Sequence, residues 1–204
     1  MRSSASAAAI GFSVHTGWAA SVSVAGPLRA PRIVDRRRIQ LSDSDDTVRA
    51  EVYHRAAQLS GTAAATFVRE AEDAAARRAR AAVESLRDSQ PLFAAGILMS
   101  AGAGKLPPDL AAILRSHPLI HTAEGVLYRE ALATAAEACG LEVVRIARRE
   151  LQDRFAAALA SDEEGARECL TVMGRAAGSP WARDQKDAAM AALVALAARK
   201  GARR

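Results

Sequence analysis

Apolar side chains alternate with polar or small ones along the N-terminal part of the chain, and this period of two is typical of β-strands. The segment Ile10–Val24 contains two such stretches on either side of a turn at Gly17. A third stretch, Arg32–Leu41, places Ile33 and Ile39 on one face. Because the connections between the stretches are short, the pattern predicts three antiparallel strands in a meander.

The spacing of apolar residues then changes to that of helices. A long helical region is predicted over Val48–Arg87, with a break near Ser60-Gly61, and an amphipathic helix over Thr122–Cys139. Two short apolar runs, Phe93–Met99 and Leu141–Ile146, suit buried strands that run parallel to the first. Further helices are expected over 109–115, 148–160, 162–176 and 182–198.

This order of elements predicts an α/β fold in three layers. Its centre is a mixed five-stranded sheet, with three antiparallel strands followed by two parallel ones, and helices flank both faces. A chain of 204 residues suits one such domain, which we expect to span residues 1–204. Residues 1–8 and 199–204 are predicted to be flexible ends.

The sequence predicts a cytoplasmic protein. No apolar run approaches the ~20 residues that a membrane helix needs, and Met1–Ala9 lacks the apolar core of a secretory signal. The two cysteines, Cys139 and Cys169, lie far apart in predicted helices. We expect both to be reduced, as is usual in the cytoplasm.

The basic composition is compatible with an anionic partner. The chain carries a net charge of +5 and has a pI near 9.9. Arg-rich helices and a basic C-terminal tail explain the same charge without contact to nucleic acid. Basic residues do not form one run, and aromatic residues make up only 4% of the chain, which argues against a platform for stacking single-stranded bases.

Three motifs follow one another along the chain in an order that has a parallel in known proteins. Gly11–Ala19 joins a strand to a Thr-Gly-Trp turn, Ala135–Arg149 leads from a helix through a Gly turn into a strand, and Asp184–Ala189 begins the last helix. Together with the predicted order of elements, they resemble the ribonuclease-H-like superfamily, and within it the RuvC-like branch. The resemblance implies a domain that acts on nucleic acid.

The same resemblance implies metal chemistry, from which the sequence departs. Nucleases of this type use several carboxylates to hold two divalent ions, Mg²⁺ or Mn²⁺, about 4 Å apart. Ser13 stands where the acid of the first strand is expected, and neither Met99 nor Ser100 supplies the acid that should end the fourth strand. Asp184 and Asp187 remain, although acids in a first helical turn are also favoured by the helix dipole. We therefore expect no standard two-metal nuclease and assign no cofactor, and Mg²⁺ or Mn²⁺ is the expected ion only if the domain is catalytic.

A second group of residues has side chains that bind metal ions. His117 and His121 are four residues apart, and Glu124 follows them. Both rings would share a face only within one continuous helix. Pro118 restricts the residue before it to extended backbone, so His117 is predicted to lie outside the helix. The sequence therefore predicts no metal site here.

Glu124 is the third candidate catalytic residue, with Asp184 and Asp187. It lies one turn before Tyr128 on the apolar stripe of its helix, so its carboxylate is expected to point toward the sheet. A structural role, as a cap or as a partner of Tyr128, and a functional one, as a general base or ligand, both remain open.

The candidate ligand-binding residues are Ser13, His15, Thr16 and Lys186. His15 and Thr16 occupy the turn after the first strand, where folds of this type meet phosphates or metal ions, and Lys186 could reach an anionic ligand. A histidine in a tight turn also serves as a local hydrogen-bonding residue, and Lys186 could simply pair with Asp187 or Asp184.

A glycine-rich segment before the predicted helix 109–115 also suggests phosphate binding. Gly102–Lys105 has the glycines and lysine of a phosphate loop, but Leu106 stands where such a loop needs Ser or Thr for magnesium. We therefore expect an ordinary loop that lies near the functional edge of the sheet.

Three functional hypotheses follow. The first is a catalytically altered ribonuclease-H-like domain that binds nucleic acid or a nucleotide, or acts as an interaction module. The second is a divergent metal-dependent nuclease with a relocated site at Glu124, Asp184 and Asp187. The third is a non-catalytic interaction protein or homo-oligomer, favoured by the Ala-rich helices. Convergence of Ser13, Glu124 and Asp187 in space would favour the second.

Overall fold

One mixed sheet organises the fold, as seen in a computed structural model that describes residues 8–42, 50–99 and 106–201. The strand order is β3-β2-β1-β4-β5. The three N-terminal strands are antiparallel, while β4 runs parallel to β1, and β5 runs parallel to β4. The predicted α/β architecture is therefore confirmed. The strands are β1 (Ala8–His15), β2 (Trp18–Ala25), β3 (Arg32–Gln40), β4 (Leu92–Met99) and β5 (Glu142–Ala147).

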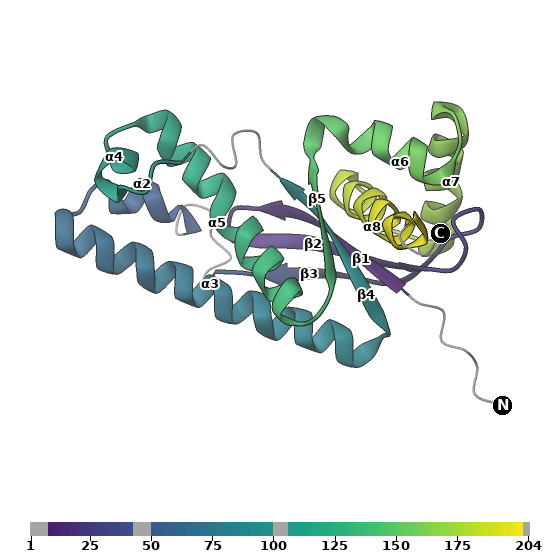
Figure 1. The fold of residues 1–204 in the computed structure, drawn as a ribbon, viewed down its shortest axis with the longest axis horizontal. Helices are drawn as coiled ribbons and strands as arrows, with labels where there is room; N and C mark the ends of the chain where they lie inside the picture. Colours follow the sequence, from purple (N-terminus) through teal and green to yellow (C-terminus); the bar gives the residue numbers. More distant parts are fainter. Residues whose placement is uncertain (1–7, 43–49, 100–105, 202–204) are drawn as a thin grey trace.

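Helices cover both faces of the sheet and give three layers (Figure 1). Two long helices lie over one face, three helices lie over the other, and two short helices lie beside the start of α5. The first group is α3 (Gly61–Ser89) and α5 (His117–Ala138); the second is α6 (Leu151–Leu159), α7 (Glu163–Ala177) and α8 (Arg183–Gly201); the short helices are α2 (Val52–Ala56) and α4 (Leu110–Leu114). A single 3-10 turn, η1 (Arg148–Glu150), joins β5 to α6.

Helix α8 lies directly on the sheet because two strand residues have no side chain. A Cβ added at Gly11 of β1 would lie 1.9 Å from the carbonyl oxygen of Ala188, and one at Gly96 of β4 would lie 2.1 Å from that of Ala191. Alanines line the helix where it crosses these strands, and they are fully buried. This close packing fixes the first turn of α8 at one end of the sheet.

A bulge changes the side-chain pattern of β3. Ile39 packs in the core under α3 and α5, whereas Ile33 packs against the core under α8. The register between β2 and β3 shifts where Ser23 pairs with Asp35 and Val24 pairs with Ile33. One extra residue moves the following side chains to the other face. The prediction that Ile33 and Ile39 share a face was therefore wrong.

Several element boundaries also differ from the predictions. Ala8, expected in a flexible end, is buried in β1, and α8 continues to Gly201 through part of the other expected flexible end. Helix α5 begins at His117 rather than at Thr122, because Pro118 lies in its first turn, where the missing N–H group costs no hydrogen bond. The predicted break before Gly61 is confirmed. Val48 and the loop 102–105 lie outside the described residues.

Two further expectations can be compared with the structure. Cys139 is buried and Cys169 is half-buried, and both are free thiols, as predicted. In the described part of the chain, no helix combines the length and the apolar character needed to cross a membrane.

Candidate functional site

A pocket of about 280 Å³ lies where the first strand ends. Strands β1 and β4 are parallel, so their carboxyl ends meet at the same edge of the sheet, where ligands commonly bind in α/β folds. Residues from the β1 end, from α5, from the start of α2 and from η1 surround the pocket. They are Val14, His15, Thr16, Glu51, His54, His121, Glu124, Gly125, Arg129 and Arg148.

Asp184, in the first turn of α8, meets the end of β1. Its Oδ1 lies 2.7 Å from Nε2 of His15 and accepts a hydrogen bond of 3.3 Å from the hydroxyl of Ser13. Gly11, two residues before Ser13, allows α8 to approach closely enough for this contact. Three of the predicted site residues are therefore brought together, with Ser13 fully buried beneath the carboxylate.

Asp187, one turn later, has different partners. Its Oδ2 lies 2.7 Å from a guanidinium nitrogen of Arg148 and 3.8 Å from Nε of Arg183. The Asp187 side chain is only 10% exposed, whereas that of Arg148 is 41% exposed. Arg148 thus neutralises a buried carboxylate on one side and faces the pocket on the other.

Arg129 of α5 places a positive charge at the ends of β1 and β4. Its guanidinium donates hydrogen bonds to the carbonyl oxygens of Val14 (2.7 Å) and Leu98 (3.1 Å), and to that of Gly125 on its own helix. Burial, together with the nearby guanidinium of Arg148, lowers the pKa of Arg129 to about 10, so it is charged at neutral pH.

Sequence reasoning missed Arg129. The signal available was local: Gly125 one turn earlier and Ala133 one turn later are small, which leaves room for a long side chain to cross the buried side of the helix. Nothing in the local pattern indicated that its partners would be the ends of two strands.

The residues present do not fit a pair of divalent ions at this edge of the sheet. Ser13 provides a neutral hydroxyl where a bridging carboxylate would be needed, and the guanidinium of Arg129 binds the strand ends as a cation. Asp187 is already in an ion pair with Arg148. The two guanidinium groups already place positive charge where the two ions would have to lie, and neither Asp184 nor Asp187 is free to offset it.

Glu124 holds the start of α2. Its Oε1 accepts hydrogen bonds from the backbone N–H groups of Tyr53 (2.6 Å) and His54 (3.2 Å). Burial raises the pKa of Glu124, and these two hydrogen bonds act in the opposite direction. The hydroxyl of Tyr128 donates instead to the carbonyl of Ala50 (2.8 Å), so of the two structural alternatives the capping contact is the one that forms.

The three candidate catalytic carboxylates therefore do not form one cluster. Asp184 is bound by His15, Asp187 by Arg148, and Glu124 by the backbone of α2 on another side of the pocket. Among the described residues, the one group of three or more histidine, cysteine or acidic side chains with ligand atoms within 4.8 Å of one another consists of histidines.

An aromatic stack continues from the pocket toward the edge strand β3. The rings of His15 and Trp18 are stacked with centroids 4.3 Å apart, and the guanidinium of Arg38 lies 3.7 Å from the centroid of the Trp18 ring. Gly17 makes the turn between β1 and β2 at a φ of 80°, and a Cβ there would meet Ala50 at 2.7 Å. The turn thus fixes His15 and Trp18 on one side of the hairpin.

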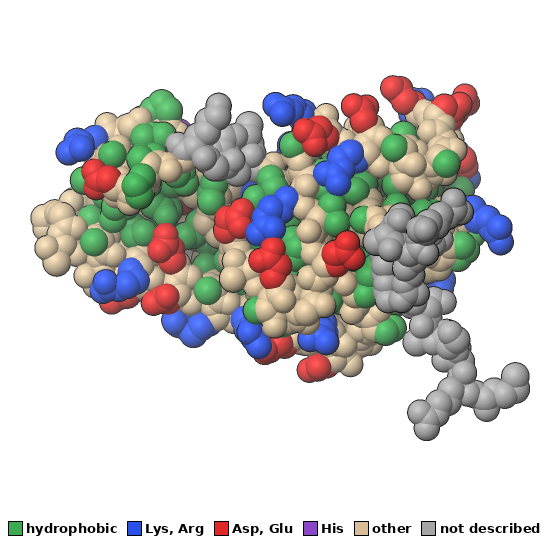
Figure 2. All heavy atoms as spheres, viewed as in Figure 1, with side chains coloured by type: hydrophobic (Ala, Val, Ile, Leu, Met, Phe, Trp, Pro, Cys, Tyr) green, Lys and Arg blue, Asp and Glu red, His purple; other side chains and the backbone are tan. Residues whose placement is uncertain are grey.

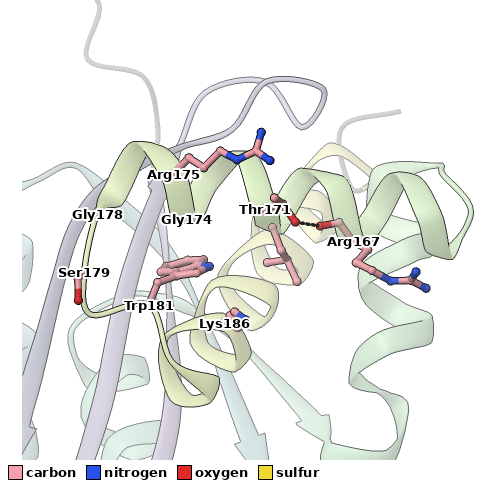
Figure 3. A pocket seen from close by; sticks show the side chains of 9 residues that line it. Arg167, Thr171, Gly174, Arg175, Gly178, Ser179, Trp181 and Lys186 are labelled. Atoms are coloured by element: carbon pink, nitrogen blue, oxygen red, sulfur yellow. Dashed lines mark hydrogen bonds between the residues drawn. The ribbon is translucent and has the colours of Figure 1, made fainter.

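Lys186 lies apart from the other predicted ligand-binding residues. It lines a second pocket of about 560 Å³ between α7 and α8, whereas His15 and Thr16 line the first. Figure 3 shows the Trp181 ring against α7 beside Gly174, with Lys186 on the neighbouring helix. A Cβ on Gly174 would lie 2.4 Å from this ring, so the glycine gives Trp181 its place.

Comparisons with known proteins agree with the geometry of the sheet. No family model matches the sequence, and no curated protein matches it. The structure is similar to that of Thermus thermophilus RuvC in complex with a Holliday junction substrate, with a TM-score of 0.54 and 14% identity over 95% of this chain and 96% of that one. A second structure of RuvC from the same organism gives the same TM-score and coverage, with 13% identity. At this identity the similarity shows the fold, which is the RuvC-like, ribonuclease-H-like fold expected from the sequence.

Proposed function

We propose that this chain is a ribonuclease-H-like domain that binds nucleic acid at the carboxyl ends of β1 and β4 and does not cleave it by two-metal chemistry. The observation that carries the proposal is Arg129. A guanidinium bound to the ends of both central strands provides a fixed positive charge at the position where the fold usually performs its reaction.

The charge of Arg129 is suited to an incoming phosphate. Its three hydrogen bonds go to neutral carbonyl groups, and among the described residues it forms no ion pair that would cancel its charge. Arg148 adds a second guanidinium that lines the same pocket and is 41% exposed. Arginine groups of this kind form strong, directional hydrogen bonds with phosphate oxygens.

The stack next to the pocket extends the candidate interface. The Arg38 guanidinium lies on the Trp18 ring, which in turn stacks on His15, and His15 lines the pocket. An exposed arginine held on an aromatic ring can contact phosphates. These residues offer a strip of two or three nucleotide contacts rather than a broad basic surface. In keeping with this, Figure 2 shows basic and acidic side chains interspersed over the face in view.

The structural comparison supports the choice of ligand. The similar Thermus thermophilus RuvC was solved with a Holliday junction substrate, and the match covers nearly the full length of both chains. Four-way junction DNA is therefore the first ligand to test, with duplex and single-stranded DNA and RNA beside it.

The test is binding measured by fluorescence anisotropy across a salt titration, in EDTA. Arg38→Gln and Arg148→Gln are each expected to weaken binding and to reduce the slope of log K against log salt by about 0.9, the value for one phosphate contact. Arg80→Gln is the matched control, since Arg80 is exposed on α3 and pairs with Glu84. It should leave both quantities unchanged.

Two results would overturn the proposal. Cleavage of junction DNA in Mg²⁺ or Mn²⁺ that is abolished by Asp187→Asn would instead support a divergent nuclease. Absence of binding to every nucleic acid tested at low salt would support the interaction or homo-oligomer hypothesis, which sedimentation analysis of the same sample then examines.

A further inference from the structure

Three histidines from two helices converge beside the pocket. His117 and His121 lie one turn apart on α5, and their Nε2 atoms are 2.9 Å apart. His54 of α2 faces both, with ring centroids 5.7 Å from His117 and 4.7 Å from His121. One ligand nitrogen from each residue can be chosen so that all three lie within 4.8 Å of one another.

We propose that His54, His117 and His121 bind a zinc ion. A hydrogen bond between His117 and His121 accounts for the contact of these two rings, but it gives no reason for the third ring, His54, to face them. Zinc–nitrogen distances of 2.0–2.1 Å in a tetrahedral site place ligand nitrogens about 3.3 Å apart. The 2.9 Å between the Nε2 atoms of His117 and His121 and the 4.8 Å limit for the whole group lie on either side of this value.

Glu124 supplies the orientation that a metal-binding histidine needs. Nδ1 of His54 lies 3.5 Å from Oε1 of Glu124, whose carboxylate is held by the backbone N–H groups of Tyr53 and His54. Both Nδ1 of His54 and Oε2 of Glu124 are buried and have no hydrogen-bond partner among the described residues. If Nδ1–H donates to this carboxylate, Nε2 of His54 carries the free electron pair and turns toward the other two histidines. A carboxylate behind a ligating histidine is the usual second shell of zinc sites.

The chemistry of the donors selects the metal. Imidazole nitrogens suit zinc and neighbouring transition metals, whereas Mg²⁺ and Mn²⁺ prefer oxygen ligands. The proposed histidine site would therefore hold a different ion from the carboxylate centre of metal-dependent nucleases, which holds Mg²⁺ or Mn²⁺. Three protein ligands leave a fourth position for water or another small ligand. Since His54, His121 and Glu124 also line the 280 Å³ pocket, the site borders the proposed nucleic-acid interface.

The experiment uses the full chain without a histidine tag, stripped of metal and then freed of chelator. Titration with zinc chloride in a calorimeter, with elemental analysis of the dialysed protein, is expected to give one zinc per chain. Cobalt(II), used as a coloured substitute, should produce the intense visible bands of a four-coordinate site, and zinc should displace it.

Substitutions locate the ion. His54→Ala, His117→Ala and His121→Ala should each weaken zinc binding by more than the roughly 10–100-fold that loss of a second-shell partner costs. Glu124→Gln should weaken it within that range and keep the stoichiometry, because Glu124 positions His54 and does not touch the ion. His15→Ala is the control, since His15 is the one histidine of the chain outside the proposed zinc site. This variant should bind zinc as tightly as the wild type.

Several outcomes would refute the zinc site. These are no binding at micromolar zinc, unchanged affinity in a His117→Ala/His121→Ala double variant, or loss of binding in His15→Ala. His117 and His121 are exposed, so the double variant is expected to fold, which circular dichroism verifies. The nucleic-acid assay is run in EDTA with other substitutions, so failure of the zinc site leaves that proposal intact.

Discussion

Alanine at Gly96 tests how closely α8 lies on the sheet. The new Cβ would lie 2.1 Å from the carbonyl oxygen and 2.6 Å from the carbonyl carbon of Ala191. Both are backbone atoms, so no side-chain rotation can relieve the contact. The helix has to move away by about 1.3 Å to reach the 3.4 Å at which ordinary contact begins. Every buried alanine of α8 then loses part of its packing.

The magnitude follows from this rigid displacement. Overpacking of a core by one methyl group typically costs about 1–3 kcal/mol, and the upper end applies where the neighbour is backbone. We expect Gly96→Ala to lower the free energy of unfolding by about 3 kcal/mol and the melting temperature by roughly 6–12 °C. Gly11→Ala should have a similar effect, since its Cβ would lie 1.9 Å from the carbonyl oxygen of Ala188. The double variant should lose less than the sum, because one movement of the helix relieves both contacts.

The assay is urea and thermal unfolding followed by circular dichroism. Gly61→Ala is the control, because a Cβ there meets nothing within 4 Å at the first residue of α3. It should change stability by less than about 1 kcal/mol, in the stabilising direction. If Gly96→Ala melted at the temperature of the control, the direct contact of α8 with the sheet would be refuted, and with it the placement of Asp184.

Three further predictions concern single residues. Arg129→Met should lower the free energy of unfolding by about 2 kcal/mol, because the strand-end carbonyls lose their donors. Removal of a buried cation offsets only part of this loss. Urea unfolding checks this, and a variant as stable as the wild type would contradict it. Burial raises the pKa of the Cys169 thiol, so its alkylation in the native protein should accelerate only at higher pH than that of cysteine in the unfolded chain; equal rates at pH 8, measured by mass spectrometry, would show that prediction to be wrong. Gly174→Ala should displace the indole of Trp181, and in a Trp18→Phe background its fluorescence should shift to longer wavelength, whereas an unchanged spectrum would argue against the packing in Figure 3.

The strands and helices were predictable because their signals are local. Alternation over Ile10–Val24 and the short connections after it determine a meander without knowledge of its partners. The bulge that separates Ile33 from Ile39 was not predictable, since it arises from the pairing of β3 with β2. The predicted start of α5 was wrong for a different reason. The rule that keeps the residue before proline out of a helix does not hold at the first turn, where His117 and Pro118 lie.

The residues of the site were predictable only in part, and their contacts were not. The sequence named Asp184, Ser13 and His15 as separate candidates, and only the structure places them in contact, although their role stays a prediction. Arg129 could not be found, because its hydrogen bond to Val14 joins residues far apart in sequence. The same holds for His54, which meets His121 only after α2 packs against α5.

A guanidinium at the strand ends has a consequence for how the site depends on its surroundings. An ion held by carboxylates exchanges with solution, so its occupancy follows the supply of free metal and is abolished by chelators. The cation of Arg129 is covalently part of the chain and is present whenever the protein is folded. With a pKa near 10, it keeps its charge throughout the physiological range. The strand-end charge is thus present in every folded molecule, so the proposed nucleic-acid binding there should respond to ionic strength and to competing anions, with no need for a dissociable cation at that position.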